Sequence, residues 1–179
     1  MSALPWGVAL TVDDLERLPD DGHRYELVDG TLIVTPAPAT AHQRCVVRLV
    51  VLLAAAAGPD LEVLVAPYDW VVGPATLFQP DVLVARRADL GPKRLERPPV
   101  LAVEVLSPST RRVDVATKRL AYADAGVPHY WLVDPDGPSL TALRLGGGSY
   151  VEEASVAGAE GWTAGSPVPV TVVPAALVE

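Results

Sequence analysis

Apolar and polar positions near the start of the chain predict a short helix followed by a β-hairpin. Thr11 and Asp14 have the spacing of a capping box, which begins a helix that Pro19 to Gly22 end. Residues 24–34 then contain two strand-like runs joined by Asp29-Gly30, the two-residue pattern of a type I′ turn. The first structured unit is therefore expected to be a helix and a hairpin.

Helices and strands are predicted to alternate along the middle of the chain. Residues 40–57 are apolar and alanine-rich up to Gly58-Pro59, which predicts a long, mostly buried helix. Residues 92–99 form a charged, proline-rich loop, and residues 114–125 predict a second helix that ends at Gly126. Strands are predicted over residues 61–65, 69–72, 81–85, 100–106 and 130–133.

This order of elements predicts an α/β chain, more closely an α+β mixed sheet flanked by helices, folded as a single domain over residues 1–179. The core is expected over about residues 10–134, with residues 135–179 forming a peripheral extension of β-hairpins. With 50% hydrophobic residues, a chain of this length can bury a core without disulfides, and it has only one cysteine, Cys45. The longest apolar run, residues 49–57, is too short to cross a membrane, so a cytoplasmic protein is expected.

The net charge of −8 opposes nucleic-acid binding by bulk electrostatics. A divalent metal and a local group of arginines could still screen the approach of a phosphate. The chain has twelve arginines but only two lysines, Lys93 and Lys118. Lysine is therefore a rare choice in this sequence, which makes Lys118 a candidate for a specific role. Lys93, in the proline-rich loop, is interpreted as a solvated charge or a phosphate contact.

Three carboxylates, Glu26, Asp81 and Glu104, lie within or at the start of strand-like apolar runs. Burying a carboxylate costs several kcal/mol unless it is paired, hydrogen-bonded or metal-bound. A shared Mg²⁺ ion, for which Mn²⁺ can substitute, would explain all three as ligands. Each also has an ordinary explanation: Glu26 could face solvent, Asp81 could cap its strand, and Glu104 could pair with a buried arginine.

Lys118 shares one helical face with Asp114, four residues before it, and Tyr122, four residues after it. A surface ion pair between Asp114 and Lys118 is one reading of this spacing. In the other, the ammonium points at the carboxylates and stabilises the charge that develops on a phosphate, or donates to the attacking water.

Five ordered motifs resemble the Uma-type restriction endonuclease family of the PD-(D/E)XK nuclease superfamily. They cover about residues 10–134 and comprise Tyr25-Glu-Leu-Val-Asp-Gly30, Gln79-Pro-Asp-Val82, Val103-Glu-Val-Leu-Ser-Pro-Ser-Thr110, the Asp114/Lys118/Tyr122 spacing, and Gly126-Val-Pro-His-Tyr-Trp-Leu-Val-Asp134. The resemblance implies a restriction-endonuclease-like fold and Mg²⁺-dependent cleavage of phosphodiester bonds, with Asp81 and Glu104 as metal ligands. It also suggests accessory roles for His42, Gln79, Asp114 and Tyr122.

The chain departs from the superfamily pattern at Leu106, where a lysine is usual, so Lys118 is expected to replace it from the helix. The leading hypothesis is a homodimeric, Mg²⁺-dependent endonuclease that cleaves DNA, with Glu26, Asp81, Glu104 and Lys118 as catalytic residues. The competing hypothesis is a non-catalytic binding or assembly module whose acidic cluster is a relic. Hydrolysis of another phosphate ester is a third possibility, because a metal cluster does not by itself recognise a base or sugar.

Overall fold

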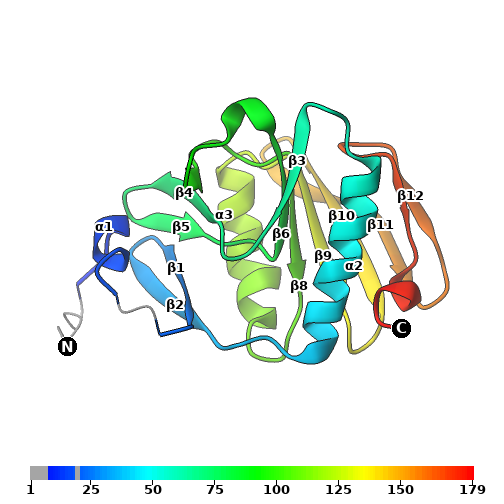
Figure 1. The fold of residues 1–179 in the computed structure, drawn as a ribbon, viewed down its shortest axis with the longest axis horizontal. Helices are drawn as coiled ribbons and strands as arrows, with labels where there is room; N and C mark the ends of the chain where they lie inside the picture. The colour runs from blue at the N-terminus through cyan, green and yellow to red at the C-terminus, as the bar shows by residue number, and fades with distance from the viewer. Residues whose placement is uncertain (1–7, 19–20) are drawn as a thin grey trace.

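The computed structural model describes residues 8–18 and 21–179 and shows a mixed α+β fold with two main sheets and few helices (Figure 1). The 3₁₀ and π-helical segments are labelled η. The elements in chain order are α1 (Val12–Leu15), β1 (Arg24–Val28), β2 (Thr31–Thr35), α2 (Thr40–Ala56), β3 (Leu61–Val65), β4 (Asp69–Gly73), β5 (Thr76–Phe78), β6 (Val82–Arg86), η1 (Arg87–Asp89), β7 (Arg94–Leu95), β8 (Leu101–Val105), η2 (Val113–Lys118), α3 (Arg119–Asp124), β9 (His129–Asp134), β10 (Ser139–Gly146), β11 (Ser149–Ala157), β12 (Trp162–Ala164), β13 (Val170–Val172) and η3 (Pro174–Leu177).

A six-stranded sheet in the order β11-β10-β9-β8-β6-β3 forms the centre of the protein. It is mixed, because β8 and β9 are parallel while the other pairs are antiparallel. Side chains alternate between its faces, so Val103 and Val105 of β8 pack with Leu49 of α2, whereas Ala102 packs with Tyr122 of α3. The two helices therefore cover opposite faces of this sheet (Figure 1).

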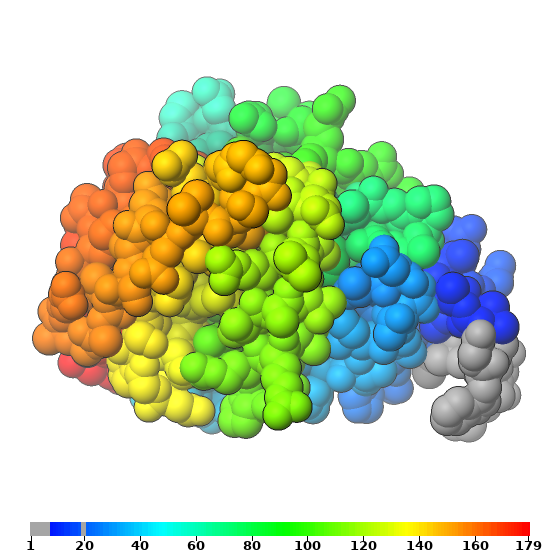
Figure 2. All heavy atoms as spheres, turned by 180° about the vertical axis from the view of Figure 1, so that it is seen from behind, coloured from blue at the N-terminus to red at the C-terminus, as the bar shows by residue number. Residues whose placement is uncertain are grey.

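A second, five-stranded sheet in the order β2-β1-β5-β4-β7 closes over α3. Trp70 of β4 and Phe78 of β5 contact the ring of Tyr122, with ring centroids 5.2 and 4.9 Å apart. Tyr122 also meets Tyr130 of the central sheet at 5.0 Å. Helix α3 is thus packed between the two sheets, and its outer side is visible between β10–β11 and β1–β2 in Figure 2.

The predicted capping box, hairpin and long helix are confirmed. Asp14 accepts a hydrogen bond from the backbone N–H of Thr11 at 2.9 Å, and Asp29 and Gly30 both have the positive φ of a type I′ turn, 48° and 78°. Helix α1 ends at Leu15, before the predicted Pro19 to Gly22 end, of which residues 19–20 lie outside the described part.

The expectation that the long helix is mostly buried was wrong. Only four of the 17 residues of α2 are buried, because the helix covers just one face of the central sheet. Val47 and Val51 on its other side are 58% and 63% exposed. Within residues 8–18 and 21–179, no helix has both the length and the apolar character needed to cross a membrane.

The strands differ from the prediction at three places. The short strands β5 and β7 were missed, and β7 lies inside the predicted proline-rich loop. Strand β6 begins at Val82, so Asp81 directly precedes it. The predicted C-terminal hairpins are present as β10–β11 and β12–β13, but the first is not peripheral: it continues the central sheet through the pairing of β10 with β9. Leu140, Ala142 and Val156 of this hairpin belong to the same core as α2.

The hairpin turn yields a stability prediction. A Cβ at Gly30 would lie 2.6 Å from the Cβ of Ala9, whereas a Cβ at Gly126, with a similar φ of 81°, would meet nothing within 4 Å. Both alanine substitutions should lose about 1 kcal/mol of unfolding free energy to backbone strain. Gly30→Ala should lose at least about 1 kcal/mol more through the clash. Urea unfolding measures the difference, and equal losses would contradict it.

Candidate active site

Strand register brings Asp81 and Glu104 together. Val82 of β6 pairs with Val103 of β8, so the next positions outward, Asp81 and Glu104, are opposite each other. The backbone N–H of Val105 donates to Asp81 Oδ2 at 2.8 Å, which fixes the carboxylate against β8. Asp81 is 4% exposed and Glu104 is fully buried. The two predicted metal ligands therefore lie side by side on the α3 face of the central sheet.

Lys118 reaches this pair of strands from the end of the π-helical segment η2. Its Nζ lies 3.0 Å from Glu104 Oε1, 3.1 Å from Glu26 Oε1 and 3.4 Å from Asp114 Oδ1, and all four side chains are at most 2% exposed. The surface-pair reading of Asp114 and Lys118 is thus excluded. π-Helical turns are rare and frequently occur at functional sites.

The predicted helical face of Asp114, Lys118 and Tyr122 is confirmed. The Tyr122 hydroxyl donates to Glu104 Oε1 at 2.7 Å, the same oxygen that accepts from Lys118. The backbone carbonyl of Asp114 accepts from the Tyr130 hydroxyl at 2.9 Å, which holds η2 against the central sheet. Helix packing and the polar cluster therefore stabilise the same arrangement.

Asp81 has two partners on its solvent side, the guanidinium of Arg24 and the imidazole of His42. Arg24 Nη1 donates to Asp81 Oδ1 at 2.6 Å, and His42 Nε2 lies 3.1 Å from Oδ2. Their side chains are 17% and 11% exposed, more than those of the carboxylates behind them. His42, at the start of α2, therefore belongs to the site rather than to the open surface.

Gln79 takes part through its backbone. Its N–H donates to Glu26 Oε1 at 2.8 Å, while its side-chain amide turns away and donates to Asp69 Oδ1 at 2.6 Å. Glu26 is 1% exposed, so the reading in which it faces solvent is wrong.

Arg24 was missed by sequence reasoning. A signal was available, because Arg24 lies two residues before Glu26 on the same strand, and residues i and i+2 share one face of a strand. A cation on that face can pair with a buried carboxylate of a neighbouring strand, but the sequence does not say which. The structure selects Asp81.

Negative charge exceeds positive charge in the cluster. Four carboxylates, those of Glu26, Asp81, Glu104 and Asp114, face the two fixed cations Arg24 and Lys118. Burial raises the pKa of Glu104 well above its usual range, and the charge of Lys118 offsets this only in part. Burial likewise raises the pKa of Asp114. These two carboxyl groups are the ones most inclined to hold a proton.

Asp81 and Lys118, in contrast, remain ionised. Burial opposes the charge of Asp81, but the hydrogen bond from His42 and the charge of Arg24 outweigh it and hold its pKa below the usual value. Burial also opposes the charge of Lys118, but the carboxylates of Glu104, Glu26 and Asp114 outweigh it and raise its pKa. Lys118 is therefore a permanent cation and cannot act as a general base near neutral pH.

The donor set suits a hard divalent cation. Eight buried side-chain polar atoms lack a hydrogen-bond partner among the described residues, and four belong to this cluster: Arg24 Nε, His42 Nδ1, Glu104 Oε2 and Asp114 Oδ1. An unpartnered carboxylate oxygen beside a second carboxylate and surplus negative charge both favour cation binding. In the described ranges, no three His, Cys, Asp or Glu side chains already converge around one point.

Comparisons with known proteins agree with this architecture. Residues 12–176 match the family described as "Uma2: Putative restriction endonuclease". The chain belongs to this family. A solved structure from Anabaena variabilis, titled "a putative nuclease belonging to DUF820", matches with a TM-score of 0.72 and 20% identity, covering 94% of this chain and 97% of the other. No curated protein matches.

Membership of the Uma2 family and the structural likeness confirm the restriction-endonuclease-like fold and support a nuclease. In this Uma2-family chain, Leu106 occupies the position where the wider superfamily has a lysine, and it is 6% exposed within the apolar cluster around α3. The ammonium of Lys118 reaches Glu104 from the helix instead. The cluster thus keeps a cation beside its second carboxylate.

The surplus negative charge predicts a pH-dependent stability. Glu104 has a higher pKa in the folded protein than when unfolded, so its contribution to stability is present below its unfolded pKa and is lost as pH rises. Glu104→Gln keeps an oxygen for Lys118 and Tyr122 but removes one charge. In EDTA at pH 8 the unfolding free energy of this variant should exceed that of the parent by about 1 kcal/mol, which raises the midpoint of thermal unfolding by about 2–4 °C.

Lys118→Met is the matched variant and should change the unfolding free energy in the opposite direction. It leaves Glu26, Glu104 and Asp114 without their shared cation and should lose about 3–5 kcal/mol. Thermal unfolding from pH 4 to pH 8 measures both effects. A Glu104→Gln protein less stable than the parent at pH 8 would contradict the assignment of surplus charge.

Proposed function

We propose that this protein is a divalent-metal-dependent endonuclease that hydrolyses phosphodiester bonds of DNA. The observation that carries the proposal is the position of Asp81, which directly precedes β6 and bonds the Val105 N–H of β8, beside Glu104, whose Oε1 lies 3.0 Å from the Lys118 ammonium. Two adjacent carboxylates and a fixed cation are what a metal-assisted attack on a phosphate requires. Family membership supports nucleic acid as the substrate.

Asp81 and Glu104 would hold Mg²⁺, or Mn²⁺ in its place, because they supply adjacent carboxylate oxygens and one of these, Glu104 Oε2, has no partner. Such a cation polarises a phosphate and lowers the pKa of a bound water. Glu26, expected from the sequence as a third ligand, is held by Gln79 and Lys118. Its part in this proposal is to position the ammonium.

Lys118 stabilises negative charge on the phosphate, since its raised pKa keeps it protonated. Arg24 and His42 lie at the solvent side of Asp81 and are the first groups that an approaching phosphate meets. Arg24 donates a hydrogen bond to Asp81 Oδ1. Asp81 is thus covered by the side chains of Arg24 and His42. When substrate binds, the guanidinium of Arg24 releases this carboxylate and bonds the phosphate instead.

Asp81→Asn and Glu104→Gln test the proposal. Each should lower cleavage of plasmid and linear DNA in Mg²⁺ at least about 1000-fold, because each removes a ligand charge that both substrate and transition state need. Each should also weaken Mn²⁺ binding, followed by electron paramagnetic resonance, at least about tenfold. The control is Asp136→Asn, an exposed carboxylate outside the cluster.

Full Mg²⁺-dependent cleavage by either variant would refute the metal assignment. Cleavage of a small phosphodiester but of no nucleic acid would instead support hydrolysis of another phosphate ester. These outcomes separate the metal site from the choice of substrate.

A non-catalytic binding module is the second candidate. It is favoured by the burial of Asp81, which is 4% exposed and paired with Arg24, and by the net charge of −8. Absence of saturable Mn²⁺ binding by the parent protein would favour this module over the enzyme.

A homodimer is part of the proposed function, since cutting two strands suits a symmetric pair of sites. The exposed side of α2, with Val47 and Val51 one turn apart, is apolar surface that a second copy could cover. Sedimentation equilibrium should give a dimer at micromolar concentration, and Val51→Glu should shift it towards monomer. A monomeric parent protein would contradict this prediction.

A further inference from the structure

A groove of about 590 Å³ lies on the outer face of the five-stranded sheet, opposite the acidic cluster. Within each strand that borders it, one set of side chains faces the groove and the alternate set faces α3. Tyr25, Leu77 and Asp69 line the groove, whereas Glu26, Phe78 and Trp70 on the same strands face the helix side. The groove and the candidate active site are thus two sides of one sheet.

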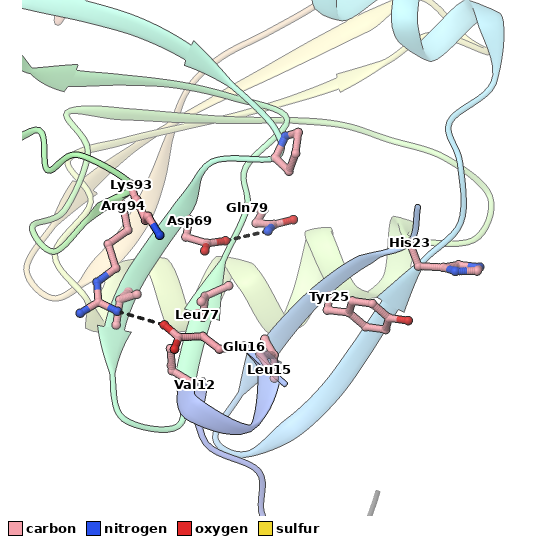
Figure 3. Close-up of a pocket in the computed structure, with 12 residues that line it drawn as sticks. Val12, Leu15, Glu16, His23, Tyr25, Asp69, Leu77, Gln79, Lys93 and Arg94 are labelled. Carbon is pink, nitrogen blue, oxygen red and sulfur yellow. Dashed lines mark hydrogen bonds and ion pairs between the residues drawn. The ribbon is translucent and has the colours of Figure 1, made fainter. Parts of the chain in front are cut away.

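Strand register arranges four groove residues in one row. Pairing of Leu27 with Leu77 places Tyr25 beside Gln79, and pairing of Trp70 with Phe78 places Asp69 on the other side of Gln79. Asp69 is in turn paired with Arg94 of β7. The row therefore runs across four strands, from Tyr25 to Arg94, at one end of the sheet (Figure 3).

This row and the acidic cluster occupy the same end of the five-stranded sheet, on its two opposite faces. Tyr25 is flanked in the chain by Arg24 and Glu26, and the backbone N–H of Gln79 donates to Glu26. Gln79 is also two residues before Asp81. A linear polymer bound in the groove would pass the end of the sheet at which Arg24 forms its ion pair with Asp81.

The two ends of the groove differ in chemistry. Lys93 and Arg94 lie at one end, and His23 and Tyr25, whose ring centroids are 6.3 Å apart, lie at the other (Figure 3). Among the described residues, no carboxylate lies within 4.0 Å of the Lys93 ammonium. Cations suit a phosphate, and aromatic rings suit the face of an unpaired base.

The ion pairs of Arg94 leave it available to a phosphate. It contacts Glu16 at 3.8 Å and Glu96 at 3.0 Å, with the three side chains 43–68% exposed. Exposed pairs of this kind contribute little stability, so an anion can compete for the guanidinium. Glu16 and Asp69 also line the groove near Arg94, so a phosphate there competes with these carboxylates for the guanidinium.

We propose that this groove binds a single-stranded segment of nucleic acid next to the bond that is cleaved. A phosphate contacts Lys93 and Arg94, and an unpaired base stacks on Tyr25 beside His23. This inference rests on the proposed function and adds to it a second subsite and a preference for unpaired strands. A paired base in a duplex could not present its face to Tyr25.

The test is fluorescence anisotropy of the full chain with a labelled single strand of about 16 nucleotides, in EDTA so that nothing is cleaved. The Lys93→Ala/Arg94→Gln double variant should bind at least about tenfold more weakly, and its salt dependence should fall by about 0.7 in slope per lost phosphate contact. Tyr25→Ala should bind about 5- to 100-fold more weakly. Tyr25→Phe, which keeps the ring, should bind like the parent.

Two further variants complete the binding experiment. Arg144→Ala removes an exposed charge on β10, away from the groove, and should bind like the parent. Glu16→Gln frees Arg94 from a competing carboxylate and should bind more tightly. Thermal unfolding of every variant establishes that losses of binding are not losses of fold. A duplex of the same sequence should compete less well than the single strand.

The inference is overturned if the parent protein does not bind the single strand at low salt, or if the groove variants bind as the parent does. Its failure is distinguishable from failure of the proposed function. Binding that depends on the groove without Asp81-dependent cleavage would refute the nuclease and retain the groove. Cleavage that depends on Asp81 with unaltered groove variants would refute the groove and retain the nuclease.

Discussion

The buried ammonium of Lys118 connects the three layers that form the candidate active site. It bonds Glu104 of the central sheet, Glu26 of the second sheet and Asp114 of its own helical segment, and all four side chains are at most 2% exposed. An uncompensated carboxylate in such a place would cost several kcal/mol, so each contact depends on the others. The position of the second sheet over α3 is therefore coupled to the geometry of the site.

That coupling leaves the cluster with more negative charge than its own cations neutralise. Protons on Glu104 and Asp114, whose pKa values burial raises, or a divalent cation can supply the balance. This surplus charge underlies both the proposed metal site and the predicted loss of stability at high pH in EDTA. The hydrogen bond from His42 and the charge of Arg24 keep Asp81 ionised.

Local sequence signals predicted much of the fold. Asp29-Gly30 specified the hairpin because few residues tolerate two successive positive φ angles, and apolar runs located β3, β8 and β9. The strands β5 and β7 are too short to show a period, and β10 and β11 lack a continuous apolar run because exposed or half-buried positions interrupt their buried ones. These four strands depend on partners far away in the chain.

The sequence by itself determined most of the candidates for the site, although not Arg24. A carboxylate within or beside an apolar strand needs a partner, which made Glu26, Asp81 and Glu104 candidates, and i+4 spacing placed Lys118 with Asp114 and Tyr122. Only the tertiary structure decided which side chains form pairs. Lys118 pairs with Glu26 and Glu104, and Arg24 and His42 pair with Asp81. Those pairings follow from register and packing between strands and helices, which no local pattern encodes.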